Sequence, residues 1–337
     1  MNSGWAREPW KALTRGGESA LAWRPALRST VKRQVKRFIR KLSFHKSNPS
    51  AAQKRQVWSI GIYAGQSLFD LAPAASGRNP VLTRENVSDI EARFVADPFM
   101  LRAKDTWHMF FEVMNRECGR GEIGLATSKN GLEWRYRQIV LTEPFHLSYP
   151  YVFEWMNDYY MIPETHKARS VRLYRASKFP QRWSFVSTLL EEQSFCDSSI
   201  FRYANTWWLY TETNPDYKFD TLRLYYADDL VGPWIEHPQS PIIEGNPHTA
   251  RPGGRVLVLG DRIIRYAQDC YPAYGTQIRA FEIIELTTTG YCEREACEHP
   301  ILIPSGNGWN ALGMHHVDPH QMDDGRWLAC VDGWLNA

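Results

Sequence analysis

Several signals that assign a chain of 337 residues to a common class are missing here. No apolar run reaches the roughly 18 residues of a membrane-spanning helix, and the first residues lack the apolar core of a signal peptide. The six cysteines are scattered, and only Cys292 and Cys297 lie close together, without the His/Cys spacing of a zinc site. We therefore expect reduced core thiols, no metal centre and a cytoplasmic location.

Motifs of other catalytic classes are also missing. There is no G-x-S-x-G, which argues against a serine esterase. The glycine-rich stretch "GGRVLVLGD" (253–261) does not follow a strand-to-helix pattern, so it is not a phosphate-binding loop. The sequence gives no reason to expect a cofactor.

Acidic residues are nearly absent from residues 1–57, which hold 14 Lys/Arg and two acids, whereas the remainder holds 26 Lys/Arg and 35 acids. Within this basic arm, residues 31–44 (VKRQVKRFIRKLSF) place apolar residues at helical spacing with basic residues between them. The pattern predicts an amphipathic helix peripheral on an anionic, inner membrane face. A solvated tail and a helix packed on a partner are alternatives, and we favour these over a nucleic-acid arm. Residues 47–56 are typical of a linker to a domain at 58–337.

Aromatic residues, by contrast, are abundant: 14 Trp and 16 Tyr favour strands and are typical of sugar sites. Three stretches can be superimposed, each predicting a strand pair that ends in a carboxylate fifteen positions after its start. Their starts and ends are Asp97 and Glu112, Tyr149 and Glu164, and Asp197 and Glu212. Each pair is followed by a third strand that closes on a turn and a Trp.

The same unit recurs at a period of roughly 50 residues, with a fourth hairpin at 251–269 and a fifth at 315–334. Four short strands per unit indicate a β-propeller. The fifth unit lacks its outer strands, and the alternating stretch 58–65 (WSIGIYAG) can supply one, which closes the ring without exposed edges. We predict an all-β, five-bladed β-propeller with a basic N-terminal helical arm; a stacked β-solenoid is the alternative.

In such a blade the start of the first strand and the end of the second share one face. The channel mouth therefore gathers many ionisable groups, and the last two blades add Arg251, Asp269, His315, His316, Asp318 and Asp332. Crowded carboxylates raise one another's pKa, which suits acid–base chemistry. For Glu112 and Asp332 we expect instead a hydrogen bond to backbone amides of the next blade, a clip between blades.

Particular motifs resemble known families. "ADPFML" and "DSSIFRYANTWWLYTET", with the "GPW" ending of a third strand, resemble the five-bladed propellers of glycoside hydrolase family 43. "FVADPFM", "GEIGLATSKNGLEW", "YPYVFEW" and "ARPGG" resemble, more specifically, the N-terminal propeller domain of glucosamine inositolphosphorylceramide transferases, over about residues 58–334. In those transferases a separate glycosyltransferase domain follows the propeller, so the resemblance does not imply nucleotide-sugar transfer by this domain.

The family 43 resemblance implies that Asp97 is the general base and that Asp197 tunes the acid and orients the substrate. Arg251 occupies the position of that family's general acid, a Glu, which leaves Glu164, Glu212 and His248 as candidates. The remaining predicted substrate contacts are Tyr149, Arg251, Asp269, His315 and His316. The two histidines also match a region near a central ion in family 43, but we favour hydrogen-bonded core histidines.

These patterns predict an enzyme that acts on a glycosidic bond of a glycan or glycolipid at the channel mouth, by hydrolysis or by transfer. The alternative is a non-catalytic glycan-binding propeller that supports a partner glycosyltransferase, and Arg251 is its main support. A propeller for protein interaction is less favoured, because its mouth would not need so many acids.

Overall fold

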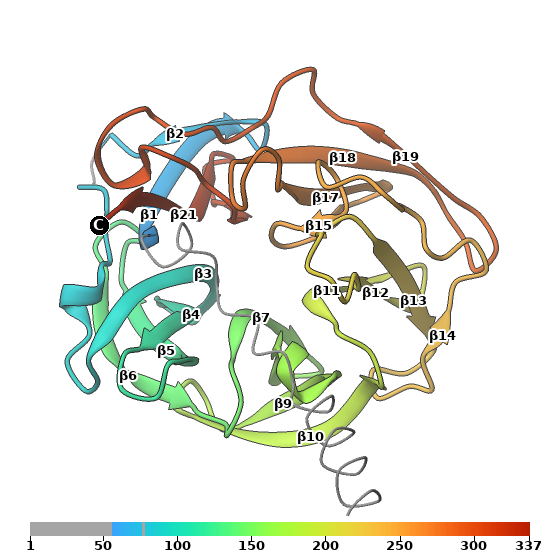
Figure 1. Cartoon of the computed structure of the whole chain (residues 1–337), viewed down its shortest axis with the longest axis horizontal. Helices are drawn as coiled ribbons and strands as arrows, with labels where there is room; N and C mark the ends of the chain where they lie inside the picture. The colour runs from blue at the N-terminus through green and yellow to red at the C-terminus, as the bar shows by residue number, and fades with distance from the viewer. Residues whose placement is uncertain (1–55, 76–77) are drawn as a thin grey trace, which may run out of the picture. The chain divides into compact units, whose positions relative to one another are not determined.

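The computed structural model describes residues 56–75 and 78–337, and its strands form five antiparallel sheets arranged around a common centre (Figure 1). The basic arm, including the predicted helix at 31–44, lies outside the described residues except for Gln56 and Val57. Among the residues described, no helix is long and apolar enough to cross a membrane. The described helices are the short 3-10 turns η2 (Arg84–Asn86), η3 (His166–Ala168) and η4 (Gly308–Asn310).

Each predicted unit forms one sheet, which confirms the β-propeller. The first blade contains β3 (Ala92–Ala103), β4 (Thr106–Asn115), β5 (Arg120–Ser128) and β6 (Arg135–Leu141). The second contains β7 (Ser148–Trp155), β8 (Asp158–Glu164), β9 (Ser170–Lys178) and β10 (Arg182–Glu191). The third contains β11 (Cys196–Tyr203), β12 (Thr206–Glu212), β13 (Leu222–Ala227) and β14 (Ile235–Glu236). The fourth contains β15 (Arg251–Pro252), β16 (Leu257–Leu259), β17 (Arg262–Asp269), β18 (Gln277–Leu286) and β19 (Tyr291–Glu295).

The fifth blade joins the two ends of the described chain. Its inner strands are β20 (Val317–Gln321) and β21 (Trp327–Asn336), and its outer strands are β1 (Gln56–Ser67) and β2 (Asp70–Pro73). β1 pairs antiparallel with β21 over ten residues, from Gln56 opposite Asn336 to Gly65 opposite Trp327. The predicted closure of the ring by the stretch 58–65 is thus confirmed, and β2 adds a fourth strand.

The burial of the strands follows their distance from the centre. In the first blade, β4 (TWHMFFEVMN) is buried along nearly its whole length, because both faces of an inner strand pack against neighbouring sheets. The residues of the outer strand β6 (RYRQIVL) are exposed or half-buried except for the last. Apolar side chains of adjacent sheets interdigitate between the blades; Phe99 of β3, for example, packs with Tyr151 of β7.

Gly254 connects the fourth blade to the fifth. It lies at φ 145° and bridges to Val317, whose carbonyl oxygen would be 1.8 Å from a Cβ atom at this position. Only glycine tolerates both this backbone conformation and this close approach.

The six cysteines are free, but the prediction that all of them are core residues is wrong. Cys196 and Cys330 are buried, whereas Cys118 and Cys292 are exposed. The last two lie at a turn and on an outer strand, where a small side chain is not enclosed.

Candidate functional site

The first strands of three blades begin with a shared local distortion. Asp97, Tyr149 and Asp197 have φ values of 53°, 44° and 50°, in the left-handed region that residues with a Cβ atom rarely adopt. The register of β3–β4, β7–β8 and β11–β12 shifts at these same positions, as in a β-bulge. Such strain clusters at functional sites and at points where the surrounding structure enforces it. All three side chains are buried.

Carboxylates link the start of one blade to the next. Asp332 Oδ2 accepts a hydrogen bond from the backbone N–H of Asp97 over 2.9 Å, so the predicted clip is confirmed for Asp332. Asp97 Oδ2 in turn accepts from the N–H of Tyr149 over 3.2 Å, and Glu164 Oε2 accepts from the N–H of Asp197 over 3.2 Å. Glu164 and Asp97, which we predicted to be catalytic, therefore also hold the ring together.

Glu112 does not form the clip that we predicted for it. Its Oε1 atom is buried and has no hydrogen-bond partner among the described residues, although the Nε2 atom of His146 lies 3.5 Å away. Burial and the neighbouring charge of Asp97 raise the pKa of Glu112 well above its ordinary value. Glu112 thus lacks the backbone partner of a clip, and its neutral form is favoured by burial.

Asp97, His315 and Asp332 form a buried row. The Nδ1 atom of His315 is 2.8 Å from Asp332 Oδ1, and its Nε2 atom is 3.5 Å from Asp97 Oδ1. The imidazole stacks on Trp58 with ring centroids 3.9 Å apart, which fixes its plane. Burial raises the pKa of Asp97 to about 6, against the opposing effect of the His315 imidazole. The carboxyl of Asp97 can therefore exchange a proton close to neutral pH.

Arg251 is bound by two of the predicted catalytic carboxylates. Its Nε–H donates to Asp197 Oδ2 over 2.6 Å, and its NH2 nitrogen lies 3.5 Å from Glu164 Oε2. Gln268 Nε2 donates to the same oxygen of Asp197 over 2.5 Å. Although burial acts in the opposite direction, the imidazole of His166 and then Arg251 hold the pKa of Glu164 well below its ordinary value. Glu164 therefore has no proton to give as a general acid.

Glu212 has the opposite environment. Its Oε1 atom accepts a hydrogen bond from the N–H of Asn214 over 2.7 Å, while its Oε2 atom is buried without a partner among the described residues. Burial raises its pKa to about 7, with Arg251 opposing the effect. Of the two carboxyl candidates for the acid, Glu212 is the one with a raised pKa and with an oxygen, Oε2, that has no partner among the described residues.

Tyr149 and His316 fill the centre of the ring. The hydroxyl of Tyr149 lies 2.8 Å from Ser199 Oγ, accepts from the N–H of Gly254 over 2.7 Å and lies 3.0 Å from the Gly254 carbonyl. The ring of His316 contacts the edges of Phe99 and Tyr149, and burial lowers its pKa to about 4. Both side chains are wholly buried, so neither can touch a glycan at the mouth without moving. The two ring nitrogens of His316 have no hydrogen-bond partner in the described chain, contrary to our expectation.

Of the remaining predicted contacts, Asp269 is buried and His248 is at the surface. The Asp269 carboxylate accepts hydrogen bonds from Gln277 Nε2 over 2.8 Å and from Arg279 Nε over 3.2 Å, and it lies 2.9 Å from His248 Nδ1. Its oxygens are therefore satisfied. The side chain of His248 is 45% exposed, and its ring lies 5.2 Å from the exposed Tyr271.

Sequence reasoning missed two aromatic residues at the mouth. The guanidinium of Arg251 lies 4.6 Å from the ring of Phe219 and 5.0 Å from the ring of Tyr274, in a cation–π arrangement. Both rings are partly exposed. They come from the connections that follow β12 and β17, and the long segment between Glu212 and Leu222 (TNPDYKFDT) was the available signal.

Two groups of side chains bring potential metal ligands within 4.8 Å of one another: Asp97, His315 and Asp332, and Glu164, His166 and Cys196. The second group fits a cation poorly. Arg251 already lies against Glu164, and burial raises the pKa of the Cys196 thiol well above its ordinary value. In the first group, His315 Nδ1 is already paired with Asp332.

Comparison with known proteins gives matches over most of the chain. A family model described as the N-terminal domain of glucosamine inositolphosphorylceramide transferase 1 matches residues 51–334. The chain is 36% identical over 296 residues to glucosamine inositolphosphorylceramide transferase 1 of Oryza sativa subsp. japonica, covering 82% of this chain and 40% of that protein. For the Arabidopsis thaliana protein of the same name, identity is 32% over 299 residues, covering 82% of this chain and 39% of that protein. The chain thus spans about two fifths of the length of these curated relatives.

Solved structures of glycoside hydrolases share the fold. An exo-1,5-α-L-arabinanase from a bovine ruminal metagenomic library superimposes with a TM-score of 0.53 at 10% identity, covering 71% of this chain and 92% of that one. At this identity the likeness shows the fold alone.

Proposed function

Since the chain belongs to the family of the N-terminal domain of glucosamine inositolphosphorylceramide transferase 1, we propose that its propeller acts on a glycosidic bond of a glycan or glycolipid. In this proposal Asp97 is the general base and Glu212 the general acid. Membership of this family, together with the propeller fold, supports a carbohydrate-related role.

The position of Asp97 carries the proposal. Its carboxyl, with a pKa of about 6, faces His315, whose other nitrogen is held by Asp332. A general base is most effective when its pKa lies close to the working pH. Asp97 would take a proton from a water or an acceptor hydroxyl as its oxygen attacks the anomeric carbon. The bond to the leaving oxygen breaks, and that oxygen takes the proton of Glu212.

The mouth supports a carbohydrate ligand. Phe219 and Tyr274 present partly exposed rings above Arg251, and exposed Tyr271 lies beside His248. Aromatic faces of this kind stack on sugar rings. Because Asp97 and Glu212 are buried, a glycan would have to displace these rings to reach them.

A second candidate is a propeller that holds a glycan without turning it over. Arg251 favours it, because it stands where the family 43 resemblance places the general acid and forms ion pairs with Asp197 and Glu164. The curated relatives are more than twice as long as the matched region, so such a module could serve a glycosyltransferase.

We also propose that residues 31–44 place the protein on the inner face of an anionic membrane, where a glycolipid is presented. The basic and apolar residues of this stretch support that proposal.

The test is a turnover and binding screen with the full chain on a panel of glycans and glycolipids. Asp97→Asn should lower turnover by about 10²–10⁴-fold, the usual contribution of a general base, while glycan binding persists. The matched control is Asp105→Asn, an exposed residue in the β3–β4 turn, which should leave turnover unchanged. Full activity of Asp97→Asn would overturn the assignment of the base. Binding of a glycan that is never turned over by the wild-type chain would favour the second candidate.

A further inference from the structure

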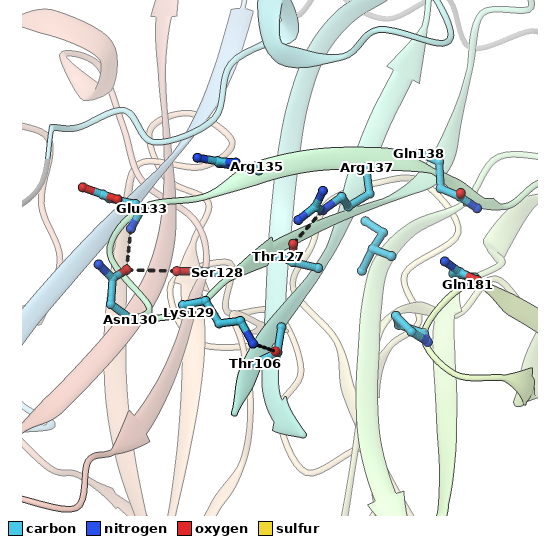
Figure 2. A pocket seen from close by; sticks show the side chains of 12 residues that line it. Thr106, Thr127, Ser128, Lys129, Asn130, Glu133, Arg135, Arg137, Gln138 and Gln181 are labelled. Atoms are coloured by element: carbon cyan, nitrogen blue, oxygen red, sulfur yellow. Dashed lines mark hydrogen bonds between the residues drawn. The ribbon is translucent and has the colours of Figure 1, made fainter. Parts of the chain in front are cut away.

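A separate cleft of about 640 Å³ opens between the first and second blades (Figure 2). Its walls come from β5, β6 and the turn between them, and from Pro180 and Gln181 in the turn between β9 and β10. Thr106, which also lines the cleft, begins β4, whereas Glu112 lies near the end of that strand. Six strand residues span about 20 Å. The cleft is therefore at the opposite end of the blade from the buried carboxylates.

Positive charge predominates in this cleft. Lys129, Arg135 and Arg137 line it, and Glu133 is the one acidic residue among the lining side chains described. None of these three cations forms an ion pair with a described carboxylate, whereas other surface arginines, for example Arg116, Arg175 and Arg262, each do. The charge of the cleft is thus left uncompensated by the protein.

Neutral groups position two of these cations. Lys129 Nζ donates to Thr106 Oγ1 over 2.8 Å, and Arg137 Nε donates to Thr127 Oγ1 over 2.7 Å, as Figure 2 shows. A hydroxyl fixes a cationic side chain without neutralising it. The terminal nitrogens of Arg137 remain available to a ligand. The side chain of Arg135, two residues away on β6, makes no hydrogen bond to the described residues. Two guanidinium groups on one strand suit a carboxylate or a phosphate.

Uncharged polar groups complete the lining. Asn130 Oδ1 accepts from Ser128 Oγ and from the backbone N–H groups of Leu132 and Glu133, which leaves its amide NH2 free. Gln138 of β6 and Gln181 of the turn between β9 and β10 also line the cleft (Figure 2). Side-chain amides both donate to and accept from sugar hydroxyls. The volume is in the range of sites for small ligands.

We propose that this cleft is a second ligand site, which binds a sugar that carries a carboxylate or a phosphate group. Arg135 and Arg137 bind the anion, and the amides of Asn130, Gln138 and Gln181 bind the hydroxyls. The proposal stands apart from the assignment of Asp97, because the two sites lie at opposite ends of the blade.

Isothermal titration of the full chain with glucose 6-phosphate, glucuronate and glucose tests the site. At least one anionic sugar should bind tenfold or more tightly than glucose, and which one does so identifies the anion. Arg135→Gln with Arg137→Gln should weaken that binding at least tenfold. The control pair is Arg262→Gln with Arg294→Gln, exposed arginines of the fourth blade that remove the same charge elsewhere. The control should bind like wild type, and so should Asp97→Asn.

Three outcomes would overturn the proposal: glucose binding as tightly as both anionic sugars, undiminished binding in the Arg135/Arg137 variant, or equal losses in the two double variants. Inorganic phosphate binding as tightly as glucose 6-phosphate would exclude recognition of the sugar. Loss of turnover in Asp97→Asn with anionic-sugar binding intact would support both sites independently.

Discussion

Arg251 donates its Nε–H to Asp197 Oδ2 over 2.6 Å, with the two side chains 9% and 2% exposed. This ion pair replaces a carboxyl group that the family 43 resemblance places at the start of the fourth blade. The Arg251 guanidinium also lies 3.5 Å from Glu164 Oε2, so that two buried carboxyl groups share one cation. Burial raises the pKa values of Asp97, Glu112 and Glu212, and also that of Asp197, where the charge of Arg251 opposes the effect.

Replacing Arg251 by Met should lower the free energy of unfolding by about 3–5 kcal/mol, because it leaves buried carboxylates without their counter-charge. Urea unfolding followed by tryptophan fluorescence measures the change. Arg262→Met is the control, since its pair with Glu282 is half exposed and such pairs contribute roughly 0–1 kcal/mol. Equal losses of unfolding free energy in the two variants would show that the buried ion pair of Arg251 contributes no more to stability than the exposed pair of Arg262.

Glu212→Gln should stabilise the protein, and more so as the pH rises. The folded-state pKa of about 7 lies above the ordinary 4.5, so the folded protein holds this proton more tightly than the unfolded chain. The stability that this provides is fully present below the unfolded pKa and is lost as the pH rises through 7, by at most about 3 kcal/mol. Glutamine keeps the acceptor for Asn214 and cannot ionise.

The difference in unfolding free energy between Glu212→Gln and wild type should therefore grow by about 1–3 kcal/mol from pH 5 to pH 8. Glu244→Gln, at an exposed position, should give a flat difference over the same range. A flat profile for Glu212→Gln as well would contradict the raised pKa.

Tyr149→Phe should cost about 1–3 kcal/mol in unfolding free energy, because it leaves the buried N–H of Gly254 without a partner, while Ser199 Oγ keeps the Gly254 carbonyl. Chemical denaturation at pH 7 measures it. Tyr160→Phe, at a half-buried position on β8, is the matched control and should change stability by less than about 0.5 kcal/mol. If Tyr149→Phe unfolds like wild type, the hydroxyl does not tie the second blade to the third and fourth.

The number of blades and the closure of the ring were predictable, because both depend on a repeated pattern and on strands that one unit lacked. The roles of equivalent acids were not predictable. Glu112 and Glu164 occupy the same place in their units, but Glu164 bonds the next backbone amide and Glu112 does not. The first blade starts with Asp97, whose carboxylate accepts a hydrogen bond from the backbone N–H of Tyr149 in the second blade. Tyr149 offers no such acceptor, so Glu164 supplies the clip in the second blade.

Contacts between blades decide these roles, and they join residues 33 and 52 positions apart. The repeat shows which residues are equivalent but not which of two carboxylates reaches a given amide. The cleft beside β6 was likewise hidden, because Arg135 and Arg137 look like solvated charges of an outer strand until Gln181 of the next blade is placed opposite them.

Deleting residues 1–55 should abolish flotation of the protein with liposomes that contain anionic lipids. Each basic residue near such a surface contributes roughly 1 kcal/mol, and the predicted helix at 31–44 carries six of them. Flotation with purely zwitterionic liposomes should be weak for both forms. Undiminished flotation of the shortened chain on anionic liposomes would contradict the membrane proposal.

The pairing of β1 with β21 has a consequence for synthesis on the ribosome. Ser67 ends β1 and Trp327 begins β21, so the partner of the first strand is made tens of seconds later at about 5–20 residues per second. Throughout that interval an apolar strand has an unpaired edge. We therefore expect nascent chains of this protein to depend on chaperones until the last blade emerges, and ribosome stalling before residue 327 to promote aggregation.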